Sequence, residues 1–143
     1  MDDEKIAGRG IRVDYYEGAY GPTIRIDAQT LDDLNKIKSM FVELAQTRRS
    51  VINFLDVVGV HTTGLDQFTL ERVETTDEFG KSLKHQRSEL AGVGFVWSLP
   101  ANGWKRCAGL IDGLIEYNRP SHQYLTKEGV DDVIVELAFK ESN

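Results

Sequence analysis

Cysteine is almost absent from this sequence, because Cys107 is the only one among 143 residues. A single thiol excludes a disulfide within the chain and any metal site built from several cysteines. This usage fits a reducing compartment. We also find no apolar run of about 18 residues, and no basic leader followed by an apolar stretch. We therefore expect a cytoplasmic protein with neither a secretory signal nor a membrane partner.

Basic residues are also fewer than acidic residues. Lysine and arginine total 17 against 23 aspartate and glutamate residues, which gives a net charge of -6. The basic residues are scattered rather than clustered, so nucleic acid is a poor partner. An acidic surface favours encounter with a basic protein, although it serves solubility equally well. The 41% hydrophobic content still allows a core, so residues 1–143 are expected to form one domain with flexible ends at 1–8 and 141–143.

Hydrophobic periodicity predicts an α+β fold with about six strands and two long helices. The strands are expected at Gly10–Glu17, Thr23–Asp27, Ser50–Val58, Phe68–Val73, Gly92–Leu99 and Asp132–Lys140. The helices are expected from Leu31 to about Gln46 and between Asn102 and Asn118. The order ββαβββαβ and the alternation within most strands indicate one largely antiparallel sheet, with one wet face and both helices packed on the other.

Both expected helices carry an apolar stripe at helical spacing. Thr30 is placed to cap the first helix. The stripe of that helix consists of Leu31, Leu34, Ile37, Phe41 and Leu44. Asn102 is placed to cap the second helix, which Asn118, Arg119 and Pro120 end. Its stripe consists of Trp104, Cys107, Ala108, Ile111, Leu114 and Ile115.

Glycine, proline and polar residues mark the connections. The segment Gly18–Pro22 predicts the turn of a hairpin, because glycine allows turn geometry and proline can only begin the second strand. His61–Gly64 is expected to link two strands. Thr75–Ala91 is predicted to be a long loop with a helical turn near Ser82–Arg87, and a loop of this length in a compact domain is mobile or functional.

Nothing in the sequence assembles a catalytic or metal-binding constellation. Cys107 lies on an apolar helix stripe, where core packing explains it better than nucleophilic catalysis. Adjacent carboxylates at Asp32-Asp33 and Asp131-Asp132 fit a helix start and a turn. We therefore assign no catalytic, cofactor-binding or metal-binding residue. The three histidines lack the spacing of metal ligands: His61, His85 and His122.

The most distinctive local sequence runs from Arg119 to Leu125, where side chains able to hydrogen-bond and stack follow a helix. Two roles remain open for His122. It hydrogen-bonds backbone or a carboxylate to hold the turn between helix and strand, or it belongs to a patch that recognises a partner. A candidate structural or recognition cluster is assigned to Trp97, Trp104, His122 and Tyr124. A candidate partner surface is assigned to the first hairpin, with Tyr15, Tyr16 and Tyr20.

Part of the C-terminal third resembles a known group of proteins. The matching positions are Phe95 to Trp97, Gly103-Trp104, Leu110 to Asp112 and His122 to Thr126. They resemble small uncharacterised bacterial proteins, some of which look like immunity proteins of polymorphic toxin systems. The resemblance implies a cytoplasmic α+β protein that binds a cognate toxin domain and blocks its active site or substrate surface. It fixes no catalytic residue and no toxin-contacting residue.

Three functions are consistent with these patterns. The first is a non-enzymatic protein-binding domain of the immunity type, favoured by the acidic charge, the small size and the missing catalytic constellation. The second is a small enzyme or ligand-binding domain with a pocket near His122, Tyr124 and Trp104. The third is a structural subunit that assembles through an exposed strand edge. No pattern in the sequence identifies the partner or the oligomeric state.

Overall fold

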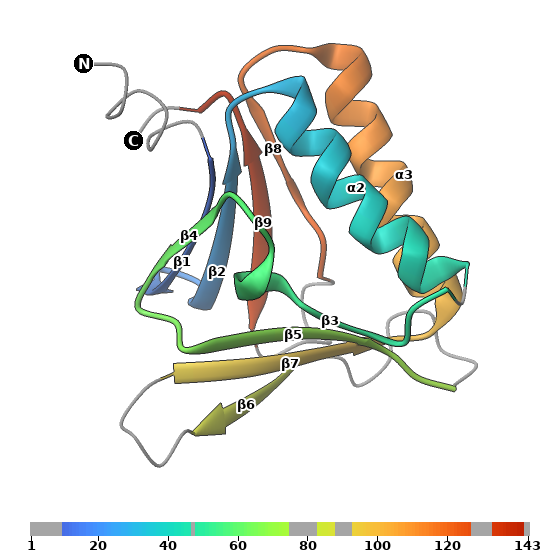
Figure 1. The fold of residues 1–143 in the computed structure, drawn as a ribbon. Helices are drawn as coiled ribbons and strands as arrows, with labels where there is room; N and C mark the ends of the chain where they lie inside the picture. Colours follow the sequence, from blue (N-terminus) through green and yellow to red (C-terminus); the bar gives the residue numbers. More distant parts are fainter. Residues whose placement is uncertain (1–9, 47, 75–82, 88–92, 127–132, 142–143) are drawn as a thin grey trace.

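The computed structural model describes residues 10–46, 48–74, 83–87, 93–126 and 133–141. Within these residues the long helices are α2 (Leu31–Ala45) and α3 (Ala101–Tyr117), and η1 (Phe54–Asp56) is a short 3₁₀ helix. The strands are β1 (Ile11–Gly18), β2 (Gly21–Ala28), β3 (Val51–Asn53), β4 (Val60–Thr63), β5 (Gln67–Arg72), β6 (Leu83–Arg87), β7 (Val93–Leu99), β8 (Ser121–Tyr124) and β9 (Ile134–Phe139). Helices and strands are segregated in space, which confirms the predicted α+β class (Figure 1). The predicted flexible end 1–8 and the loop at Thr75–Ala91, apart from β6, lie outside the described residues.

Two sheets form where one was expected. The first is five-stranded with the order β4-β1-β2-β9-β8, and the second is four-stranded with the order β3-β5-β7-β6. The pairs β1–β2, β8–β9, β3–β5 and β6–β7 are antiparallel, whereas β1–β4, β2–β9 and β5–β7 are parallel. The prediction of a single, largely antiparallel sheet is therefore wrong. The parallel pairs join strands that are not neighbours in the sequence, a relation that local alternation cannot reveal.

The strands that the sequence analysis missed or misjudged all lie at sheet edges. The predicted link His61–Gly64 contains most of β4, the predicted helical turn near Ser82–Arg87 is β6, and the turn after the second helix contains β8. The predicted strand Ser50–Val58 shortens to β3, because Phe54–Asp56 forms η1. Edge strands pair on one side only and are often short and polar. They therefore lack the apolar alternation by which a half-buried strand is recognised.

Helix α2 begins and packs much as the sequence predicts. The backbone N–H of Asp33 donates to Thr30 Oγ1 at 3.1 Å, and the backbone N–H of Thr30 donates to Asp33 Oδ2 at 3.2 Å. These two bonds form a capping box, which satisfies donors at the start of the helix. Leu31 is 38% exposed, so the buried stripe begins one turn later than predicted. The buried apolar residues of the stripe are Leu34, Ile37, Met40, Phe41 and Leu44.

Helix α3 starts directly after Pro100 without a side-chain cap. Asn102, the predicted cap, is instead an exposed residue of the first turn. The helix ends at Asn118 as predicted, because this residue adopts a left-handed backbone (φ 48°) and its N–H donates to the Leu114 carbonyl. The predicted stripe is confirmed, with Trp104, Cys107, Ala108, Ile111 and Leu114 buried and Ile115 partly buried.

Strands β1 and β2 form the predicted hairpin. Gly18 pairs with Gly21, which leaves Ala19 and Tyr20 as a two-residue loop. Gly21 has a φ of 122°, a backbone conformation that strains any residue with a side chain. The tight turn exposes Tyr20 at the tip of the hairpin.

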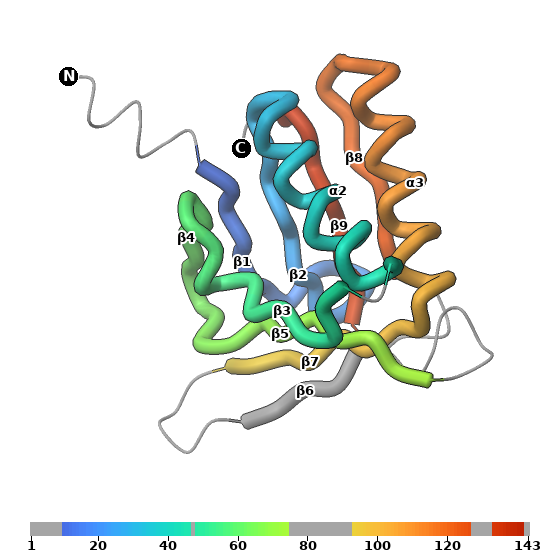
Figure 2. The backbone as a smooth tube through the Cα atoms, turned by 45° about the vertical axis from the view of Figure 1, so that its right-hand side comes forward, coloured from blue at the N-terminus to red at the C-terminus, as the bar shows by residue number. Residues whose placement is uncertain are grey.

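The two helices lie side by side on one face of the five-stranded sheet, and the four-stranded sheet crosses their ends (Figure 1, Figure 2). Both helices thus pack on a single face of the five-stranded sheet, as predicted. Aromatic side chains join the helices to the four-stranded sheet: Phe41 from α2, Trp104 from α3, Phe68 from β5 and Trp97 from β7. The ring centroids of Trp97 and Trp104 are 4.9 Å apart. The buried residues of the described chain form one hydrophobic core that includes both sheets and both helices.

Candidate functional site

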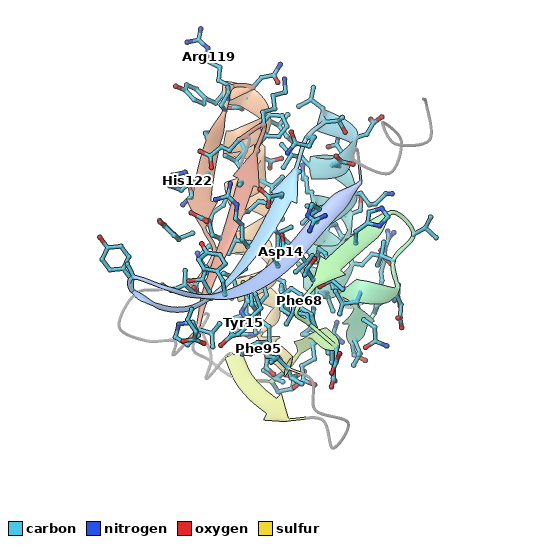
Figure 3. The ribbon with its side chains drawn as sticks, turned by 90° about the vertical axis from the view of Figure 1, so that its left-hand side faces the viewer. Asp14, Tyr15, Phe68, Phe95, Arg119 and His122 are labelled. Atoms are coloured by element: carbon cyan, nitrogen blue, oxygen red, sulfur yellow. The ribbon has the colours of Figure 1, made fainter. Side chains whose placement is uncertain are left out.

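The face of the five-stranded sheet that points away from the helices carries polar and aromatic side chains. We call this surface the outer face. Figure 3 looks onto it, with Asp14 and His122 labelled. Strand register arranges its side chains in rows that run across the sheet from β1 toward β8. The rows are Asp14, Arg25, Glu136 and Tyr124, then Arg12, Asp27, Ala138 and His122, and then Tyr16 and Thr23.

Arg25 holds the centre of the outer face. Its guanidinium donates from Nε to Asp27 Oδ1 at 3.0 Å. It also donates from Nη1 to Glu136 Oε1 at 3.4 Å and from Nη2 to Glu141 Oε1 at 3.5 Å. Burial lowers the pKa of this guanidinium, but the hydrogen bond and charge of Asp27, together with the other two carboxylates, outweigh burial and leave the pKa raised. A single cation therefore connects β2, β9 and Glu141, a residue that the sequence placed in a flexible end.

Asp27 is a carboxylate in the interior, with only 3% of the residue exposed. Its Oδ1 accepts the hydrogen bond from Arg25, but its Oδ2 has no hydrogen-bond partner among the described residues. Burial raises the pKa of the Asp27 carboxyl, and Arg25 opposes this shift without cancelling it. A buried acceptor left unsatisfied costs about 1 to 3 kcal/mol. The charged form of Asp27 therefore lowers the free energy of unfolding.

Replacement of Asp27 by asparagine should change how stability depends on pH. The pKa of Asp27 in the folded state lies above its ordinary value, so the folded state binds this proton more tightly than the unfolded state does. Wild-type protein should therefore gain free energy of unfolding, relative to Asp27→Asn, as the pH falls from about 7 toward about 4. Urea unfolding of both proteins across this range measures the difference.

The exposed residue Glu116 of α3 supplies the control for this experiment. Glu116→Gln removes the same charge from a position outside the outer face that makes no ion pair with another described residue, so it measures the effect of net charge. After that effect is subtracted, a difference that moves in favour of Asp27→Asn at low pH would show that the fold stabilises Asp27 as a carboxylate.

His122 lies on β8 at the edge of the outer face. Its Nδ1 is 3.0 Å from Glu141 Oε2, and its Nε2 is 3.9 Å from Glu136 Oε2. The imidazole also stands edge-on to Tyr124, with ring centroids 5.6 Å apart. His122 therefore contacts a carboxylate, as one of its two predicted roles required. It does so from a strand, however, and connects β8 to the segment after β9 instead of holding a turn.

Exposed tyrosines lie on the outer face and at the tip of the β1–β2 hairpin. Tyr16, Tyr20 and Tyr124 are 43%, 90% and 49% exposed. The charge of Glu136 is the largest cause that raises the pKa of the Tyr124 hydroxyl. The charges of Tyr16 and Tyr20 add to that rise in pKa. The sequence assigned Tyr16 and the pair His122 and Tyr124 to separate candidate sites, and strand register directs all three to one face of the sheet.

Tyr15 points to the opposite side of the sheet from Tyr16. Its ring centroid lies 5.2 Å from that of Phe95 in β7, a contact between the two sheets (Figure 3). Its hydroxyl donates to Glu17, and this hydrogen bond, with burial and the charge of Glu17, raises the pKa of Tyr15 to about 12. Tyr15 is therefore separate from the exposed tyrosines with which the sequence grouped it.

The two tryptophans of the predicted cluster are separate from the outer face as well. Trp97 and Trp104 are fully buried, and the Trp104 Nε1 donates to the Glu71 carbonyl oxygen at 3.0 Å. The predicted cluster thus divides into a core pair of tryptophans and a surface pair formed by His122 and Tyr124. These two pairs do not line a common pocket.

The charged centre of the outer face was not predicted from the sequence. Arg25 and Asp27 alternate with buried isoleucines in β2, and Glu136 interrupts an apolar run in β9. Charged residues within otherwise apolar strands were the available signal, because a charge is rarely buried without a partner.

The described part of the chain contains no group of three or more histidine, cysteine, aspartate or glutamate side chains placed to hold a metal ion. No helix within the described residues is both long and apolar enough to cross a membrane. No known family, curated protein or solved structure matches this chain. The functional argument therefore depends on the residues of the outer face themselves.

Proposed function

We propose that this chain is a non-enzymatic binding protein that docks a basic protein on its outer face, and that it acts as an immunity protein against a cognate bacterial toxin domain. The observation that supports this best is the exposure of Tyr16 and Tyr124 on the same face of the sheet, with Tyr20 exposed at the hairpin tip, beside an excess of carboxylates. Tyrosine is enriched in protein interfaces and among the residues that dominate binding energy. Exposed rings beside a charged face therefore suit a docking role.

The charge on the outer face favours a cationic partner. Among the residues that the structure describes, two guanidinium groups, those of Arg12 and Arg25, are ion-paired there with four carboxylates: Asp14, Asp27, Glu136 and Glu141. With a net charge of -6 for the whole chain, this excess speeds the encounter with a basic protein and disfavours an acidic one. Because Arg25 and its partners are mostly buried, salt screens their field less than it screens exposed pairs.

The outer face is also suited to binding because it is rigid. Strands β1, β2, β9 and β8 are hydrogen-bonded neighbours, and their opposite face packs into the core beneath the helices. A surface that is ordered before association loses little conformational entropy when a partner docks. Tyrosine has few rotatable bonds, so its side chain also loses little conformational entropy when it contacts a partner.

The toxin-neutralising part of the proposal rests on the resemblance of the C-terminal third, which includes His122 and Tyr124. Both of these side chains are exposed and lie on the outer face. The segment that carries the resemblance thus contributes directly to the surface that the charges and tyrosines single out. A cytoplasmic location, expected from the cysteine usage, is part of the same proposal.

Coexpression with the product of the adjacent gene tests this function. We expect the neighbouring product to arrest growth when expressed alone, and this chain to restore growth and to co-purify with it. The affinity should fall as salt concentration rises, because the partner is basic. A neighbouring product that is harmless alone, or a toxic one that this chain does not counteract, would show that the immunity function is wrong.

A further inference from the structure

Glu136 and Tyr124 are paired neighbours in adjacent strands of the outer face. The Tyr124 ring is half exposed, and the His122 imidazole stands edge-on to it, with ring centroids 5.6 Å apart. The face of an aromatic ring carries negative potential, so rings beside a carboxylate attract a cation more strongly than either group does alone. This combination of rings and carboxylate is the first sign of a site for a positively charged side chain.

The charge balance around Glu136 is the second sign. Its carboxylate shares the guanidinium of Arg25 with Asp27 and Glu141. One cation cannot neutralise three carboxylates, and the Asp27 and Glu136 side chains are only 4% and 10% exposed. Charge that is not neutralised at this depth is poorly screened by water, so it produces a field above the sheet that favours a second cation.

Asp27 supplies an independent sign. Register directs its side chain to the outer face, yet Oδ2 is buried and has no partner among the described residues. Arg12, the residue across the strand pair, instead donates to Asp14 Oδ1 at 3.3 Å and to Thr63 Oγ1 at 3.0 Å. A cation brought to this surface would reduce the cost of keeping Asp27 charged.

We infer that the outer face accepts one arginine or lysine side chain of its protein partner beside Tyr124 and Glu136. The inference rests on the proposed function and adds the chemistry of the contact. The cationic group lies over the Tyr124 ring and donates to the Glu136 carboxylate, and the field of Asp27 adds to the attraction. Arginine fits better than lysine, because a planar guanidinium stacks on a ring while it donates hydrogen bonds within its plane.

A hexa-arginine peptide is a suitable probe, and a hexa-citrulline peptide is its matched control, since citrulline keeps the shape of arginine without the charge. Hexa-arginine should shift the amide NMR signals of β8, β9 and the β1–β2 hairpin to saturation, and hexa-citrulline should leave them in place. Glu136→Gln and Tyr124→Ala should each weaken hexa-arginine binding about tenfold.

Glu116→Gln and Tyr117→Ala are matched control variants, because both residues are exposed on α3 and lie outside the outer face. Each should change the affinity by less than about twofold. Equal weakening by Glu116→Gln and Glu136→Gln would show diffuse attraction to an acidic protein, and shifts confined to helix signals would place the peptide elsewhere. Either result overturns the inference. Amide spectra show whether each variant is folded, and Tyr124→Ala, which removes an exposed ring, tests the site even if Glu136→Gln does not fold.

Different experimental results would contradict the inference and the proposed function. If growth is rescued while hexa-arginine binds all variants alike, the chain is a binding protein that makes no use of this cation site. If hexa-arginine binds as expected while growth is not rescued, the cation site stands and the immunity function is wrong.

Discussion

Trp104→Ala is expected to lower the free energy of unfolding by about 4 kcal/mol, as is typical when a buried tryptophan is truncated. Trp104 is fully buried, and its ring lies 4.9 Å from Trp97 and 5.4 Å from Phe41, measured between centroids. Truncation would leave a cavity where α2, α3 and the four-stranded sheet meet, and it would deprive the Glu71 carbonyl of its donor. A domain has about 5 to 15 kcal/mol of stability in total, so the midpoint of urea unfolding should fall steeply.

Two further variants make the Trp104 experiment specific. Trp104→Phe keeps an aromatic ring in the core but loses the hydrogen bond to Glu71, and it should cost about 1 to 3 kcal/mol. Tyr117→Ala removes a ring from the same helix at a position that is 58% exposed, and it should cost less than about 0.5 kcal/mol. Equal stabilities for Trp104→Ala and Tyr117→Ala would contradict the core described above.

The double variant Tyr16→Ala and Tyr124→Ala is expected to bind the partner about a hundredfold more weakly or worse, with little change in stability. Both rings are more than two-fifths exposed, so the folded state loses little burial when they are removed. In an interface, by contrast, a tyrosine that dominates the binding energy contributes about 2 kcal/mol or more, and two such contributions do not add strictly. Isothermal titration with the neutralised partner measures the affinity, and coexpression measures the loss of rescue.

Tyr117→Ala is again the matched control for partner binding, because it removes one exposed ring from the helical side of the protein. It should bind and rescue as wild type does. Rescue by the double variant that equals wild-type rescue would show that the partner docks somewhere other than the outer face.

The parts of the fold that were predicted correctly from the sequence depend on interactions between residues that are close together in the chain. Thr30 and Asp33 form a cap from residues three positions apart, and Asn118 ends α3 through its own backbone. The two sheets could not be predicted in this way, because β2 pairs with β9 and β5 pairs with β7 across long stretches of chain. The sequence of a strand shows which of its faces is apolar, but it does not show which strand lies beside it.

The candidate site was predicted only in part, because the sequence does not show which distant residues the sheet places side by side. His122, Tyr124 and Tyr16 were found from their chemistry, and strand register directs them to one face of the sheet, with Tyr20 at the tip of the hairpin. Tyr15 was grouped with Tyr16 although successive residues of a strand point to opposite faces, and the tryptophans were included because residue type does not distinguish core from surface. Arg25 was missed because Glu136 lies 111 residues away in the sequence.

The position of β9 in the five-stranded sheet has a consequence for synthesis on the ribosome. β9 lies between β2 and β8, so the β1–β2 hairpin emerges with one edge open. At about 5 to 20 residues per second, the 111 residues between Arg25 and Glu136 take roughly 5 to 20 s to translate. During that interval the edge of β2 can pair with a strand from another nascent chain. Fast translation of the chain, or a chaperone bound to this hairpin during synthesis, should therefore raise the yield of folded protein.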